Sequence, residues 1–375
     1  MIDVARKILL QDRLRFLITV SGVAFAVMLV LVQVGLFLGL LGYATVTIEH
    51  AGADLWVTSR NTANVDFAIP FSENYVQRVR SVPGVACADN LIVGFVRITL
   101  PVGTTESMMI YGLEHFAHWN LPWRVLEGDL ADLRRGKFFF LDDSARKRYG
   151  EVRVGEFREV SGYRLRLIGR TAEAKSFTTT PVAFVDFRLA QQLDASTLSG
   201  KTTYILVRVA RGADVATVQS EIQRRLPFHD VQTRSRWAQI SRNYWINNTG
   251  LGMSMYLTVF LGCLVGVVIV AQTLYTSVME HFKEFATVKA IGGSNLDIYR
   301  IIGKQAAIAG VCGFAVGSAL SLAMAQAMAL ADLTLVLEPP FFGMVFLGTL
   351  FFCLSASALS FWKISGMDPA LVFRS

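Results

Sequence analysis

A pair of histidines and four scattered cysteines are the residues whose side chains are best suited to bind a metal. His115 and His118 lie three positions apart, but no third potential ligand stands beside them in the sequence, so we expect no metal site. Only Cys87 lies in a polar part of the chain. The cysteines therefore predict neither a metal motif of the CxxC type nor a disulfide framework.

Acid–base and nucleophilic chemistry find little support. Two carboxylate pairs, Asp142-Asp143 and Glu127 with Asp129, have the side chains of a general acid and base, but we interpret them as turn and surface residues. The chain contains no GxSxG, HExxH or GxxxxGK[ST] pattern. We therefore expect no enzyme, no catalytic residues and no bound cofactor, because the standard loop for holding nucleotide phosphates is missing.

The elements that dominate the chain are apolar. Hydrophobic residues make up 53% of the 375 residues and charged residues only 17%, which favours a membrane protein. Four stretches without any charge, 16–44, 251–279, 305–331 and 339–362, are long enough for a bilayer core of about 30 Å. The first resembles a signal peptide but is about twice as long as a signal h-region, so we interpret it as a retained helix.

Basic residues in the short flanking segments predict the orientation. Segments 1–15, 280–304 and 363–375 carry lysine and arginine, whereas 332–338 carries neither, so the first three are expected in the cytoplasm and the last outside. Residues 45–250 then lie outside the cytoplasm. Trp237, Tyr244 and Trp245 are expected in an aromatic belt at the outer membrane surface.

The segment 45–250 is long enough to bury a core of its own, and its patterns are mixed. Ser72 and Asp214 are candidate caps of two helices, the second with a stripe of Val215, Val218 and Ile222. Strands are expected at 91–100, 107–111, 137–141, 163–168, 181–185 and 203–209. We predict an α+β domain, either as one body or in two lobes. The net charge of +7 fits anionic lipid headgroups, an anionic substrate or a plain solvated surface, and no nucleic-acid partner is expected.

Glycines four residues apart recur in three of the four apolar stretches. On a helix this spacing puts both glycines on one face, where another helix can approach closely. We expect such packing either within the chain or against a second copy. The pairs are Gly35/Gly39, Gly262/Gly266 and Gly313/Gly317.

The segment after the second apolar stretch carries the functional signal. It reads E-F-A-T-V-K-A-I-G-G-S over 284–294, in which apolar and charged residues alternate as on a short interfacial helix. The tail reads M-D-P-A-L-V-F-R over 367–374, and G-A-D-L-W-V follows the first stretch at 52–57.

Together these segments resemble the FtsX/MacB-like permeases of type VII ABC transporters. The inner segment is similar to their EFGxLKAIG stretch, the tail to their DPAxxLR ending with Phe373 in place of leucine, and 52–57 to DevC-like members. The order of one span, a large outer domain and three further spans also agrees.

The resemblance implies a permease subunit in the bacterial inner membrane, with both termini cytoplasmic, that pairs with a second copy and a separate cytoplasmic ATPase. ATP and Mg would bind to that ATPase, and its movement would drive the outer domain to export or extract an amphiphile such as a lipid, glycolipid, haem or hydrophobic drug. A periplasmic membrane-fusion adaptor is a further expected partner. The ATPase-facing positions implied by the resemblance are Glu284, Lys289, Gly292, Gly293, Asp368 and Arg374.

Two other classes stay open. The same architecture in FtsX-like proteins controls cell-wall hydrolases, so a transmembrane signalling subunit is the alternative function. A membrane enzyme is disfavoured, because no polar constellation interrupts the apolar stretches.

Overall fold

The computed structural model describes residues 13–281, 287, 294–330 and 333–365. They form two compact units, a helical unit of residues 1–39 and 252–375 and an outer unit of residues 40–251. Each unit has its own hydrophobic core and is described by itself.

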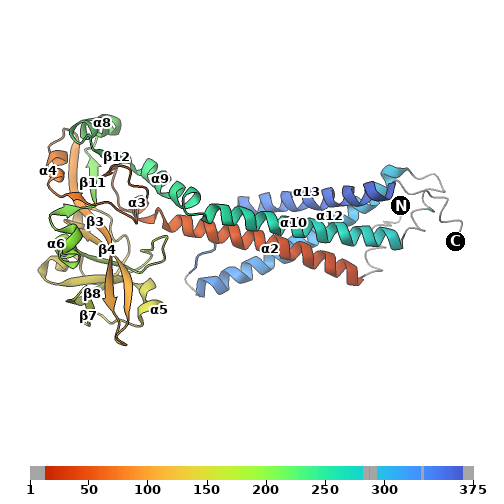
Figure 1. Ribbon diagram of the computed structural model, residues 1–375, viewed down its shortest axis with the longest axis horizontal. Helices are drawn as coiled ribbons and strands as arrows, with labels where there is room; N and C mark the ends of the chain where they lie inside the picture. Colours follow the sequence, from red (N-terminus) through yellow and green to blue (C-terminus); the bar gives the residue numbers. More distant parts are fainter. Residues whose placement is uncertain (1–12, 282–286, 288–293, 331–332, 366–375) are drawn as a thin grey trace. The chain divides into compact units, whose positions relative to one another are not determined.

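Four long helices make up the helical unit (Figure 1). They are α2 (Arg13–Tyr43), α10 (Leu251–Glu280), α12 (Asn295–Leu330) and α13 (Pro339–Ser365). Each contains a window apolar and long enough to cross a membrane. On α10, Phe260, Leu264 and Val268 are spaced by four and are 62%, 46% and 57% exposed, as expected of a helix face in lipid.

The third helix begins earlier than expected from the end of the charged segment. We predicted the inner segment to run to residue 304, but α12 is helical from Asn295. Ser294 and Asp297 explain the difference, since the Asp297 carboxylate accepts a hydrogen bond from the Ser294 backbone N–H (3.0 Å) and the Asp297 N–H donates to Ser294 Oγ (3.3 Å). This reciprocal capping box starts the helix ten residues before the charge-free stretch.

One large mixed sheet organises the outer unit (Figure 1). Within the described residues its order is β12-β1-β11-β3-β4-β9-β6-β8-β5, and β7 pairs with both β3 and β8. The pairs β4–β9 and β6–β8 are parallel and the others antiparallel. The strands are β1 (Leu55–Ser59), β3 (Val85–Thr99), β4 (Thr105–Leu113), β5 (Val125–Glu127), β6 (Phe138–Asp142), β7 (Phe157–Val160), β8 (Tyr163–Thr171), β9 (Val182–Asp186), β11 (Tyr204–Val209) and β12 (His229–Thr233). A separate pair joins β2 (Phe71–Ser72) to β10 (Lys201–Thr202).

Alternating side chains divide the core between the two faces of this sheet. On β3, Leu91 and Val93 face one cluster with Trp56 and Trp119, whereas Ile92 faces the opposite side. That opposite side holds two clusters, one around β1 and β11 and one around β4, β6 and β9. The 15-residue strand β3 takes part in all three clusters, so the outer unit is one sheet with two helical covers rather than two separate lobes.

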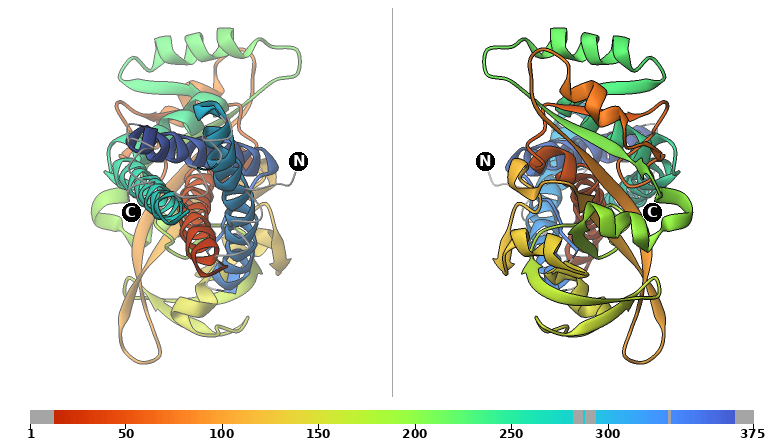
Figure 2. Two further views of the ribbon diagram at one scale, coloured as in Figure 1. Left: turned by 90° about the vertical axis from the view of Figure 1, so that its right-hand side faces the viewer. Right: turned by 90° about the vertical axis from the view of Figure 1, so that its left-hand side faces the viewer.

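Short helices cover the sheet (Figure 2). They are α3 (Val46–His50), α4 (Tyr75–Arg80), α5 (Arg146–Tyr149), α6 (Phe187–Leu193), α7 (Ala195–Leu198), α8 (Val215–Arg225) and α9 (Arg234–Asn247), with 3₁₀ turns η1 (Phe116–His118), η2 (Leu130–Arg135) and η3 (Asp143–Ala145). Asp214 caps α8 as predicted, accepting a hydrogen bond from Thr217 N–H (2.8 Å). Ser72 does not cap α4, because it lies in β2 and the helix begins after Asn74.

The prediction of an aromatic belt is wrong for two of its three residues. Trp237 and Trp245 on α9 are 1% and 6% exposed and pack inside the outer unit. The Trp245 ring stacks on the Phe177 ring with centroids 3.9 Å apart, and the centroid of the Trp237 ring lies 6.0 Å from that of Tyr204. A tryptophan next to an apolar stretch in the sequence can belong equally to a domain core, which the sequence pattern does not distinguish.

Asp66 is an ionisable group buried in this core. Its Oδ2 has no hydrogen-bond partner among the described residues, and burial raises the pKa of the carboxyl from 3.8 to about 7, although a hydrogen bond from the Phe177 backbone opposes the shift. The nearby Tyr111 hydroxyl is paired with Thr47 Oγ1 at 2.9 Å and offers no positive charge to Asp66. The protonated form of Asp66 is therefore favoured in the folded chain below neutral pH.

We predict that Gly112→Ala destabilises the outer unit. A Cβ on Gly112 would lie 2.3 Å from Cβ of Ala190 in α6, so the helix must move off the strand, at a cost of about 1 to 3 kcal/mol. Gly94→Ala on the paired strand β3 is the matched control, because no atom lies within 4 Å of its added methyl group. Thermal unfolding of the purified full chain, followed by the β-sheet circular dichroism signal, measures both. Equal midpoints for the two variants would contradict this packing.

A second prediction concerns the pH dependence of stability through Asp66→Asn. Between about pH 4 and about pH 7 the unfolded wild-type aspartate ionises while the folded one stays protonated, so wild-type stability falls across this window. The neutral amide does not ionise. The difference in unfolding temperature between the variant and the wild type should shift in favour of the variant as pH rises to about 7 and then level off. A pH-independent difference would contradict a raised pKa.

Candidate functional site in the membrane helices

Helix α2 is contacted closely by α10. A Cβ added at Gly262 would lie 2.9 Å from Leu29 Cδ2, and one at Gly266 would lie 2.9 Å from Ala26 Cβ. These distances are shorter than van der Waals contact, so the two helices are as close as glycine allows.

Helix α12 approaches another part of α2 in the same way. An added Cβ at Gly313 would lie 2.5 Å from Val23 Cβ, and one at Gly317 would lie 2.6 Å from the carbonyl oxygen of Ala24. The glycine pairs on α10 and α12 therefore both face α2, which lies among the other helices when the helical unit is viewed along its length (Figure 2).

The third glycine pair lies on α2 itself. Gly35 and Gly39 face the segment that joins α12 to α13, where an added Cβ at Gly39 would lie 1.9 Å from the carbonyl oxygen of Thr334. The Val336 N–H donates a hydrogen bond to the Gly35 carbonyl at 3.0 Å. This bond satisfies a backbone donor in a non-helical segment at the end of the helices. All three predicted pairs thus lie at contacts within the chain, and their use between two copies stays a prediction.

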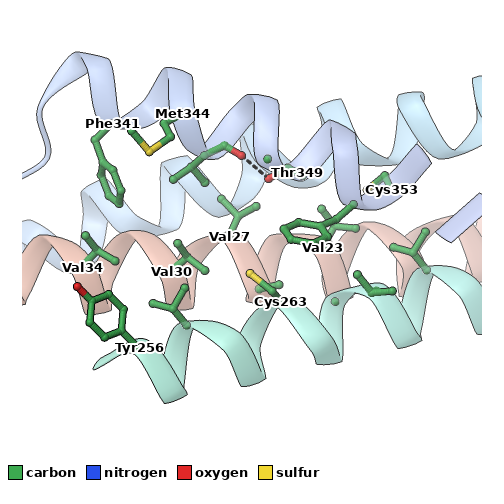
Figure 3. A pocket seen from close by; sticks show the side chains of 18 of the residues that line it. Val23, Val27, Val30, Val34, Tyr256, Cys263, Phe341, Met344, Thr349 and Cys353 are labelled. Atoms are coloured by element: carbon green, nitrogen blue, oxygen red, sulfur yellow. Dashed lines mark hydrogen bonds between the residues drawn. The ribbon is translucent and has the colours of Figure 1, made fainter. Parts of the chain in front are cut away.

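An apolar cavity of about 460 Å³ lies between α2, α10 and α13 (Figure 3). Its polar side chains are few, and Thr349 is already satisfied because its Oγ1 donates to the Val345 carbonyl at 2.7 Å. Tyr256 and Cys263 reach it from α10 (Figure 3). The main apolar lining comes from Val23, Val27, Val30, Val34, Phe341 and Met344. Such a cavity suits a hydrocarbon chain and offers nothing to pair with a charge.

The positions implied to face an ATPase lie outside the described residues. Glu284, Lys289, Gly292 and Gly293 precede α12, and Asp368 and Arg374 follow α13. Among the described residues, the Ser294–Asp297 capping box directly follows Gly293, and Glu280 at the end of α10 forms an ion pair with Arg15 at the start of α2. This ion pair joins the two helices at the end where the inner segment begins.

Three of the four side chains in the two carboxylate pairs have structural partners in the outer unit. Asp142 Oδ1 caps η3 through Ser144 N–H (3.0 Å), and its Oδ2 accepts from Ala174 N–H (3.0 Å). Asp143 is bonded to Arg170, and Asp129 caps η2 through Ala131 N–H at 2.9 Å. These contacts are those of turns and helix caps.

Comparison with known families agrees with this architecture. Residues 16–225, more than half of the chain, match the model of the MacB-like periplasmic core domain, and residues 256–369 match that of the FtsX-like permease C-terminal region. The outer unit resembles the periplasmic region of MacB from Actinobacillus actinomycetemcomitans, with a TM-score of 0.41 and 10% identity over 51% of this chain and 94% of that one. A second solved structure, the extracellular domain of the transporter YknZ from Gram-positive bacteria, gives a TM-score of 0.38 and 15% identity over 48% of this chain and 99% of that one.

Relatives by sequence are permeases as well. An uncharacterized ABC transporter permease of Mycobacterium bovis is 25% identical over 366 residues, which are 97% of this chain and 96% of the relative. Another, from Methanocaldococcus jannaschii, is 24% identical over 185 residues, 47% of this chain and 44% of that protein. With four membrane-type helices, an α+β domain between the first and the second, and these two family matches, the chain belongs to the FtsX/MacB-like family of ABC transporter permeases.

Proposed function

We propose that this chain is the permease subunit of an ATP-driven exporter in which movement, rather than a central pore, links the ATPase to the substrate. The substrate is an amphiphile such as a lipid, glycolipid, haem or hydrophobic drug. The observation that carries this choice is the apolar cavity between α2, α10 and α13, which matches a hydrocarbon chain in size and polarity.

The helices are suited to transmit movement. Helix α2 has 31 residues and α10 has 30, so at 1.5 Å per residue each is about 45 Å long. Close backbone contacts at Gly262, Gly266, Gly313 and Gly317 leave no space for independent sliding of α2 against α10 and α12. A push on the inner end of one helix is then passed to the others.

Energy enters, in this proposal, through a separate cytoplasmic ATPase that binds ATP and Mg. The chain lies in a bacterial inner membrane, with both termini and the inner segment on the cytoplasmic side. A second permease copy completes the transporter, and an adaptor outside the membrane is a further partner. The charged segment around Glu284 and Lys289 follows α10 directly, so a partner bound there acts on both α10 and α12. Such coupling requires that the partner binds one permease conformation more tightly than the other.

We predict that Glu284→Lys combined with Lys289→Glu weakens recruitment of the ATPase or its stimulation, by about 5- to 150-fold if the contact supplies a typical coupling free energy. Lys201→Glu, at an exposed position of the outer unit, is the control for the reversal at Lys289, since it makes the same lysine-to-glutamate change outside the inner segment. Co-purification of the complex and its ATP hydrolysis rate are the measurements. Wild-type recruitment and hydrolysis in the double variant would rule out this contact.

Filling the cavity tests the substrate class. Cys263→Trp projects an indole from α10 into the cavity and should abolish stimulation of ATP hydrolysis by amphiphiles, tested with a lysophospholipid, haem and a hydrophobic dye in the reconstituted complex. Val268→Trp on the same helix is the matched control, since its side chain is exposed and lies outside the cavity lining. Basal hydrolysis should be unchanged in both.

The outcomes separate the two candidate functions. Loss of stimulation in Cys263→Trp alone supports export of an amphiphile, and equal stimulation of both variants contradicts a role of the cavity. Absence of stimulation in the wild type, together with binding of a cell-wall hydrolase by the outer unit, favours the signalling alternative.

A further inference from the structure

Asp89, His115 and His118 converge on one small region of the outer unit. Asp89 lies on β3, His115 precedes the turn η1 as its N-cap residue, and His118 is the last residue of that turn. His115 Nδ1 lies 2.9 Å from Asp89 Oδ1, and His118 Nδ1 lies 2.6 Å from Asp89 Oδ2. One possible ligand atom from each of the three residues lies within 4.8 Å of the others. The sequence shows no third ligand beside the histidines because Asp89 precedes them by 26 residues and is brought there by the sheet.

The local fold explains why the two rings lie side by side. In a 3₁₀ turn, side chains three positions apart eclipse one another. The His115 and His118 rings accordingly stack, with centroids 4.9 Å apart and planes at 23°. Phe116 between them is buried, and the His118 N–H donates to the His115 carbonyl, so the turn is held in place.

The carboxylate sets the proton positions on both imidazoles. Asp89 is 1% exposed, and its oxygens also accept hydrogen bonds from Trp119 Nε1 (2.9 Å) and Arg80 Nη2 (2.8 Å). An ionised carboxylate only accepts hydrogen bonds, so each histidine donates through Nδ1–H. A metal ion bound among the three residues would take the place of these two Nδ1 protons, since metal binding releases protons from its ligands.

The atoms that converge are the Nδ1 atom of each histidine and the oxygens of Asp89, and two imidazoles with one carboxylate are a ligand set found at zinc sites. The cluster borders a cavity of about 290 Å³, which Arg80 and Cys87 also line, and the histidine side chains are 38% and 44% exposed. The positive charge of Arg80 repels a cation at this place. Its Nη2 atom, however, contacts two carboxylates, Asp89 at 2.8 Å and Glu114 at 2.9 Å. The two carboxylates therefore outnumber the guanidinium that contacts them.

We propose that Asp89, His115 and His118 form a binding site for one divalent transition-metal ion. Imidazole ligands favour zinc, copper and nickel over magnesium and calcium, and zinc accepts two imidazoles together with one carboxylate. Three protein ligands leave a coordination position to water or to a group from another molecule. This site is independent of the cavity between the membrane helices and of the proposed export function.

The test uses the purified full chain in detergent, with any affinity tag removed. Dialysis against Zn²⁺ followed by elemental analysis should give one zinc per chain, and Co²⁺ should give the visible absorption of a coordinated ion. His115→Gln with His118→Gln should abolish both signals. His50→Gln, another exposed histidine of the outer unit, and Cys87→Ser should leave them unchanged.

Asp89→Asn examines the carboxylate as a ligand, since a neutral amide in its place should weaken metal binding strongly. Because Asp89 is buried with four hydrogen bonds, this variant is interpreted only if its circular dichroism matches the wild type. The double histidine variant is the decisive test of metal binding. Both side chains are more than a third exposed, so their replacement should leave the fold intact. Equal zinc content in wild type and double variant, or none in either, would overturn the proposal and leave the histidines as hydrogen-bond donors to Asp89.

Discussion

The close approach of α2 to its neighbours is the constraint on which the helical unit depends. Inside a bilayer the hydrophobic effect does not hold helices together, so van der Waals contact between backbones must do so. Gly266 and Gly313 provide it from two different helices, and Gly39 provides it toward the segment before α13. Because these contacts all involve the first helix, the N-terminal part of the chain organises helices that are encoded more than two hundred residues later.

The outer unit depends on a different constraint, the continuity of β3. This strand is paired with β11 in its first half and with β4 and β7 further along, so it joins the two ends of the sheet. Its side chains alternate between the clusters on the two faces, so this one strand contributes to all three hydrophobic clusters of the outer unit.

The two units divide the chemistry between them. Few polar groups line the cavity among α2, α10 and α13, whereas the three side chains of the proposed metal site, Asp89, His115 and His118, lie in the outer unit. An apolar substrate and a hydrated cation have opposite requirements, since burial favours the first and costs the second its hydration. Separate sites for the two therefore agree with physical expectation.

The sequence by itself determined the four membrane helices, the place of the α+β domain between the first two, and the family, because charge-free stretches of this length and the motif over 284–294 are local features. It also predicted the Asp214 cap and six of the twelve strands of the described residues, which depend on neighbouring residues. Only the tertiary structure decided what α2 contacts, where Trp237 and Trp245 lie, and that Asp89 joins His115 and His118. These depend on residues far apart in the chain, and their pairing follows from the sheet and the bundle as a whole rather than from any local pattern.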